Sequence, residues 1–235
     1  MHSSPHRSEW PPFTRGLAHA CALAAMGVLA AVSSAGAGVI RGTLHTTHDV
    51  QDVRSHNAYP GRASSLPMSR MMAHGAVGDA VVWLEHVPAA ADTVIPGPRP
   101  KLAQKDQCFQ PRVLPVAVGT AVDFPNMDPI FHNVFSASPI KRFDLGKYPR
   151  GQSKRVIFDK PGLVNVYCDI HSDMEAFVLV LTTHVFTQPD GNGDFVLPPV
   201  PPGDYTLHVW HPDRSELKRD VQVPARGDLA LELDW

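Results

Sequence analysis

The stretch VNVYCDIHSDMEAF, residues 164–177, decides how this sequence is interpreted. It opens with apolar side chains that alternate with polar ones, which is typical of a β-strand. It then carries Cys168, His171 and Met174 at intervals of three residues. A thiolate, an imidazole and a thioether are the ligands that redox-active copper prefers. The spacing therefore predicts a copper site on the turn that follows a strand.

The alternation along the chain also predicts which way the candidate ligands point. In LVNVYC, Val164, Val166 and Cys168 share one face, because successive side chains of a strand alternate between its two faces. In HNVFS, His132 and Val134 share a face for the same reason. We therefore expect Cys168 and His132 to point toward an apolar interior. A type 1 copper site needs a second histidine, and His132 is the best candidate.

Composition favours a soluble, all-β protein. The chain has 235 residues, of which 43% are hydrophobic and 19% are charged. Its net charge is only −2, so nothing indicates that it binds nucleic acid. Its 23 prolines and 17 glycines lie beside short runs rich in valine, leucine and phenylalanine. This punctuation predicts many short strands joined by turns, and no stretch has the pattern of an amphipathic helix.

The first 37 residues have the pattern of a secretory signal peptide. Arg7 and Arg15 precede an apolar run at 16–32, and small residues at Ala35 and Ala37 form a cleavage site. We expect export to the periplasm, with no membrane span after signal cleavage; an uncleaved anchor is the alternative. Cleavage leaves Cys108 and Cys168, so a disulfide between them is the alternative to a copper thiolate in that oxidising compartment.

The residues around the candidate ligands carry a specific resemblance. FHNVF and YCDIHSDM together resemble the small cupredoxins of the plastocyanin, amicyanin and pseudoazurin group. Segments 123–136, 141–151 and 158–171 together resemble periplasmic plastocyanin-like proteins labelled methylamine-utilisation proteins. The resemblance implies a cupredoxin Greek-key β-sandwich at 101–182 with one type 1 site cycling between Cu+ and Cu2+. The implied residues are His132, Cys168 and His171 as equatorial ligands, Met174 as the axial ligand, and Asn133 as a tie between the ligand loops. Ile170 departs from the family, which commonly has proline there.

The flanking segments resemble a second kind of β-sandwich. GVIRGTL and DAVVWLE, within 38–90, and GDFVLPPVPPGDYTLHVW, within 183–235, resemble the two halves of a transthyretin-like, carboxypeptidase-regulatory-type domain. The resemblance implies that these halves pack together and that the copper-binding block is inserted between them; two separate domains in tandem are the alternative. Within the second half, DGNGDF and PPGDY are hairpin signals. The basic segment 141–155 is interpreted as a solvated loop, with docking of an acidic redox partner as the alternative.

These observations predict a periplasmic one-electron carrier. Its partner would be a redox protein such as a periplasmic cytochrome or dehydrogenase. Two alternatives use the same chain differently: a copper carrier or sensor without a redox relay, and a structural or interaction β-sandwich protein. We do not expect an enzyme, because no nucleophile-plus-base motif, phosphate loop or second copper site is evident in the sequence.

Overall fold

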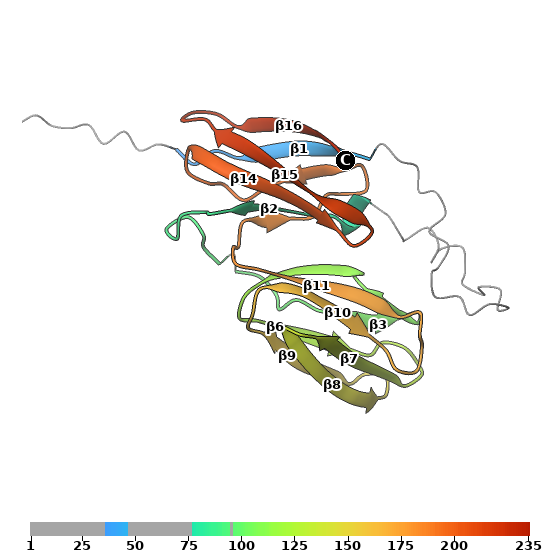
Figure 1. Ribbon diagram of the computed structural model, residues 1–235. Coiled ribbons are helices and arrows are strands. Elements are labelled where there is room, and N and C mark those ends of the chain that lie inside the picture. Colours follow the sequence, from blue (N-terminus) through green and yellow to red (C-terminus); the bar gives the residue numbers. More distant parts are fainter. Residues whose placement is uncertain (1–35, 47–76, 95) are drawn as a thin grey trace, which may run out of the picture. The chain divides into compact units, whose positions relative to one another are not determined.

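The computed structural model describes residues 36–46, 77–94 and 96–235 (Figure 1). The expected signal peptide lies outside these ranges, except for its last two residues. The described residues form β-strands and one short 3-10 helix, η1 (Val77–Asp79), and they contain no α-helix. The prediction of an all-β fold is therefore confirmed. Within the same ranges, no helix is long and apolar enough to cross a membrane.

Residues 101–181 form one group of strands. Their bounds are Ala103–Lys105 (β3), Cys108–Gln110 (β4), Val113–Ala117 (β5), Thr120–Pro125 (β6), His132–Ser138 (β7), Lys141–Tyr148 (β8), Ser153–Phe158 (β9), Gly162–Tyr167 (β10) and Glu175–Leu181 (β11). A five-stranded sheet has the order β5-β11-β10-β7-β8, and β6–β9 and β3–β4 form two smaller sheets. Strand β5 is parallel to β11, whereas β10 is antiparallel to both β11 and β7.

The core of this group lies between the five-stranded sheet and the β6–β9 pair. Phe124 and Phe158 come from the small sheet, and Val134, Val164 and Val166 come from the large one. Each of these side chains is at most 1% exposed. The two valines of β10 thus face inward, as the alternation along this strand predicts. The same core cluster includes Cys168 and Met174.

The basic segment at 141–155 is not a loop, and this expectation was wrong. Its first half is strand β8, which pairs with β7 at the edge of the five-stranded sheet. Phe143 and Leu145 alternate with polar residues and pack against the core. Lysine and arginine on an edge strand oppose pairing with another chain, so a high charge here is compatible with a strand.

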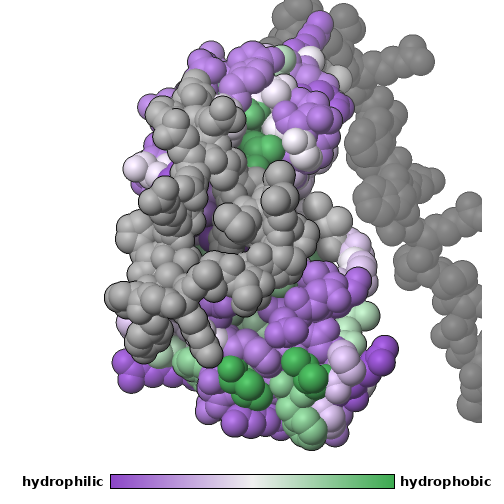
Figure 2. Space-filling view, turned by 90° about the vertical axis from the view of Figure 1, so that its right-hand side faces the viewer, coloured by the Kyte–Doolittle hydropathy of each residue, from purple (hydrophilic) through white to green (hydrophobic). Residues whose placement is uncertain are grey.

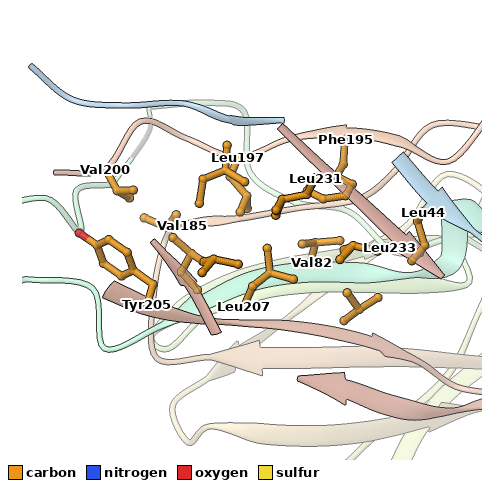
Figure 3. Packing of buried hydrophobic residues seen from close by; sticks show 14 of the residues in the cluster. Leu44, Val82, Val185, Phe195, Leu197, Val200, Tyr205, Leu207, Leu231 and Leu233 are labelled. Atoms are coloured by element: carbon orange, nitrogen blue, oxygen red, sulfur yellow. The ribbon is translucent and has the colours of Figure 1, made fainter. Parts of the chain in front are cut away.

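Residues on both sides of this group form the second set of sheets. Their strands are Ile40–His45 (β1), Val81–Glu85 (β2), Phe186–Thr187 (β12), Asp194–Val196 (β13), Gly203–His211 (β14), Arg214–Val223 (β15) and Leu229–Asp234 (β16). One sheet has the order β13-β1-β16 and the other β12-β2-β14-β15. Figure 3 shows Val82 and Leu207 of one sheet pointing toward Leu231 and Leu233 of the other. Strands from 36–46, 77–94 and 185–235 therefore share one core.

The two hairpin signals of the last segment mark changes of chain direction, but neither joins paired strands. The turn at 190–193 leads from β12 to β13, whereas the chain only bends at Pro202, directly before β14. Strand β13 pairs with β1, whereas β12 and β14 both pair with β2 in the other sheet. The hairpin prediction was therefore wrong at both places. Turn residues indicate that the chain reverses, but they do not determine which strand it meets next.

Candidate metal centre

The ends of two adjacent strands carry the predicted ligands. His132 is the first residue of β7, and Cys168 follows the last residue of β10. These strands are neighbours, paired through Phe135 and Tyr167. The connection from β10 to β11 carries His171, and the N–H of Met174 donates to the carbonyl oxygen of His171 at 3.1 Å, which closes the turn.

Three ligand atoms converge at this point. The Nδ1 atoms of His132 and His171 are 3.1 Å apart. The Sγ atom of Cys168 lies 3.9 Å from Nδ1 of His132 and 3.8 Å from Nδ1 of His171. Among the described residues, this is the one group of at least three histidine, cysteine or acidic side chains whose ligand atoms are this close together.

These separations fit a single metal ion. Bonds of about 2.0 Å to nitrogen and about 2.3 Å to sulfur, spread about 120° apart, separate two nitrogens by about 3.5 Å and nitrogen from sulfur by about 3.7 Å. The observed separations of 3.1, 3.8 and 3.9 Å are within a few tenths of an ångström of these values. Two imidazoles and a thiolate in this arrangement are the equatorial ligand set of type 1 copper.

The centre is shielded from water on most sides. His132 is fully buried and Cys168 is 5% exposed. Met174 is 1% exposed and lies in the same core cluster as Cys168. His171 is half-buried and is the most accessible of the four side chains. A metal held here would have one partly open edge, on the side of His171.

Asn133 links the two segments that carry the ligands. Its side-chain oxygen accepts a hydrogen bond from the N–H of Asp169, next to Cys168, at 3.4 Å. Its amide nitrogen donates to a carboxylate oxygen of Asp144 on β8 at 2.6 Å. The N–H of Gly146 and the Asn133 amide together hold the pKa of Asp144 below its usual value. Such outer contacts orient ligands and tune a metal centre.

Asp128 is the residue of this centre that sequence reasoning missed. Its carboxylate lies 2.8 Å from Nε2 of His132, the ring atom that faces away from the other ligands. It also accepts hydrogen bonds from the N–H groups of Asp106 and Gln107, at 2.7 and 2.8 Å. Burial raises the pKa of Asp128, but the contacts with Gln107, His132 and Asp106 outweigh it and lower the pKa overall. A carboxylate four residues before a candidate histidine ligand was the available signal.

A buried polar network lies beside the centre and was also missed. Tyr148, which pairs with His132 across β7 and β8, is 1% exposed. Its hydroxyl donates to the carbonyl oxygen of Phe124 at 2.9 Å and accepts from the Gln104 side chain at 2.5 Å. Burial raises the pKa of Tyr148, with Gln104 acting in the opposite direction. The phenol therefore stays neutral beside the candidate thiolate.

Neither described cysteine is part of a disulfide. Cys168 is buried in the metal centre, whereas Cys108 is half-buried at the start of β4. The alternative of a Cys108–Cys168 disulfide is therefore absent from the structure. Cys168 keeps its sulfur directed at the two imidazoles.

No protein-family model and no curated protein matches this chain. Among solved structures, it is similar to a purple cupredoxin from Nitrosopumilus maritimus, with 22% identity over 35% of this chain and 99% of that one, at a TM-score of 0.33. It is also similar to the Cu(I) form of an amicyanin mutant, with 20% sequence identity and a TM-score of 0.34. That match covers 43% of this chain and 98% of the amicyanin chain. A third similar structure is a copper-containing nitrite reductase from Thermus scotoductus, with 26% sequence identity and a TM-score of 0.35. That match covers 41% of this chain and 27% of the reductase chain.

Proposed function

We propose that this chain is a cupredoxin-type protein with one type 1 copper site that carries one electron at a time. The observation that carries the proposal is the convergence of Nδ1 of His132, Sγ of Cys168 and Nδ1 of His171 within 3.9 Å of one another. When bound, copper would supply the Cu+/Cu2+ couple. Met174 would be the weak axial ligand, and its thioether would tune the potential.

The chain's own contribution is a frame that changes little between the two oxidation states. His132 and Cys168 are held at the ends of hydrogen-bonded strands, and Asn133 ties the second ligand turn to β7. Close packing around Met174 and Cys168 resists displacement of either side chain. A site that needs little rearrangement favours rapid electron transfer.

Electrons would enter and leave through the edge of His171. Its neighbour Ile170 is 41% exposed, and Met127 and Phe131, in the loop before His132, are 52% and 55% exposed. A large contiguous patch of exposed apolar side chains typically marks a docking surface. Figure 2 shows hydrophobic surface among hydrophilic residues in the lower part of the face that lies at the right of Figure 1. Ile170, which precedes His171 in the chain, would belong to such a docking surface and make brief contact with a redox protein.

The proposal includes export and a partner. The signal-peptide pattern of residues 1–37 supports a periplasmic location. The partner would be a periplasmic cytochrome or dehydrogenase. A copper carrier or sensor would use the same side chains, but it would have to release its metal readily. The burial of His132, Cys168 and Met174 favours retention of the metal and therefore electron transfer.

The test is a visible and an electron paramagnetic resonance spectrum of the mature chain with Cu(II), beside Cys168→Ser and Cys108→Ser. We expect an intense blue band and a narrow copper hyperfine splitting, lost in Cys168→Ser and kept in Cys108→Ser, the matched control. Stopped-flow mixing of the reduced protein with an oxidised c-type cytochrome should then show rapid electron transfer. A colourless wild-type protein would refute the copper site. A blue protein that releases copper readily and exchanges electrons slowly would favour the carrier.

A further inference from the structure

We infer that Asp128 is the residue that positions His132 and selects the ring nitrogen it offers to the metal. The inference deepens the proposed function and rests on it for the identity of the metal. Asp128 does not face the metal position itself. It acts through the imidazole, because its carboxylate lies 2.8 Å from Nε2, while Nδ1 is the atom directed at Cys168 and His171.

The contact with Asp128 fixes the tautomer of His132. A neutral imidazole has one N–H, which resides on either Nδ1 or Nε2. An ionised carboxylate is only an acceptor, so the contact with Asp128 requires the proton on Nε2. Nδ1 then carries a lone pair directed at the other two ligand atoms. Without Asp128, a proton on Nδ1 would compete with the metal for this nitrogen.

The turn between β3 and β4 holds the Asp128 carboxylate in place. One of its oxygens accepts the N–H of Asp106, and the other accepts both the N–H of Gln107 and the His132 ring. Asp106 and Gln107 form the turn between β3 and β4 and both have positive φ values of 56°. This left-handed pair is uncommon for residues other than glycine, and it directs two successive N–H groups at one carboxylate. The β3–β4 turn is thereby connected to the metal ligand.

The negative charge of Asp128 would affect the two copper oxidation states differently. The side chain of Asp128 is 7% exposed, so its negative charge is poorly screened by water. A fixed anion at the outer edge of His132 stabilises the doubly charged cupric ion more than the cuprous ion. Asp128 should therefore strengthen Cu(II) binding more than Cu(I) binding and lower the reduction potential.

The experiment compares the wild type with Asp128→Asn and with Asp106→Asn as the matched control. The control removes a carboxylate from the exposed end of the same network and keeps the backbone N–H that bonds to Asp128. Affinities for Cu(II) and Cu(I) are measured by competition with chelators of known affinity. The histidine tautomers of the metal-free proteins are read from long-range ¹H–¹⁵N NMR spectra.

We expect Asp128→Asn to bind Cu(II) about 10- to 100-fold more weakly, with a smaller loss for Cu(I). A tenfold change in the ratio of the two affinities corresponds to a rise in potential of about 59 mV. The metal-free wild type and Asp106→Asn should show His132 protonated at Nε2, and Asp128→Asn should populate the Nδ1 form.

Two results would overturn the inference: an Nδ1–H tautomer in the metal-free wild type, or an affinity ratio in Asp128→Asn that equals that of Asp106→Asn. A wild-type chain that bound no copper would instead refute the proposed function. The NMR spectra of the metal-free proteins would still decide whether Asp128 positions His132. Failure of one proposal is thus distinguishable from failure of the other.

Discussion

Replacing Asn133 by alanine tests whether the link between the ligand segments stabilises the fold. Asn133 is 1% exposed, donates to the ionised Asp144 at 2.6 Å and accepts from the N–H of Asp169 at 3.4 Å. A hydrogen bond to a charged group contributes about 1.5–3 kcal/mol, and the longer neutral one about 0.5 kcal/mol. The variant should therefore lose about 2–3.5 kcal/mol of unfolding free energy.

The assay is urea denaturation of the metal-free protein, with m unchanged if the loss is confined to the native state. Asn192→Ala is the matched control, because Asn192 is exposed and its backbone N–H keeps its bond to Asp190. We expect the control to change the unfolding free energy by less than about 0.5 kcal/mol. The pKa of Asp144 should rise in the Asn133 variant, because one of the two bonds that lower it is lost. A stability loss no larger than that of the control would refute this reasoning.

Three further predictions address the core, the second set of sheets and pH. Met174→Leu should change the unfolding free energy of the metal-free protein by less than about 1.5 kcal/mol, because the substitution conserves volume. It should nevertheless shift the reduction potential of the copper form. An unchanged potential would argue against Met174 as an axial ligand. Gly42→Ala should lower the free energy of unfolding by about 1–3 kcal/mol, measured by thermal or urea denaturation. The added Cβ would lie 2.6 Å from the ring of Phe195 and 2.8 Å from the backbone oxygen of Leu231. A variant as stable as the wild type would contradict this packing. The Arg155 guanidinium holds the pKa of Asp123 below its usual value. The ion pair therefore stabilises the fold at pH values above about 4, the pKa of an aspartate in the unfolded chain. This stabilisation is lost as the pH falls through the lower pKa that Asp123 has in the folded protein. Asp123→Asn should therefore be less stable than the wild type at pH 7, and this gap should shrink in acid, whereas a gap independent of pH would exclude the ion pair as its cause.

The alternation of apolar residues allowed the local strands of the core to be predicted from the sequence. Val164, Val166 and Cys168 lie on one buried face, as a period of two requires. Strand β8 was missed because its lysines and arginines resemble a solvated loop. Only the pairing with β7 shows that Phe143 and Leu145 face the core, since edge strands tolerate charge on their open side.

The segments at 190–193 and 201–202 show a different limit. Glycine, proline and aspartate encode a change of chain direction through local backbone preferences, and the structure has a turn at 190–193 and a bend at Pro202. Which strand follows is a matter of sheet assembly. Strand β13 pairs with β1, whose sequence lies far upstream, because the two sheets must close over one shared core.

For the candidate metal centre, the sequence by itself predicted the kinds of ligand and their order. Cysteine, histidine and methionine at intervals of three residues need only a short turn to come together, and His132 was identified by its place on a strand. Tertiary structure alone decided which nitrogen of His132 faces the cysteine and that Asp128 holds the other. These contacts join residues from β7, from the connection between β6 and β7, and from the turn after β10. Their separations depend on strand pairing and packing, which no local pattern encodes.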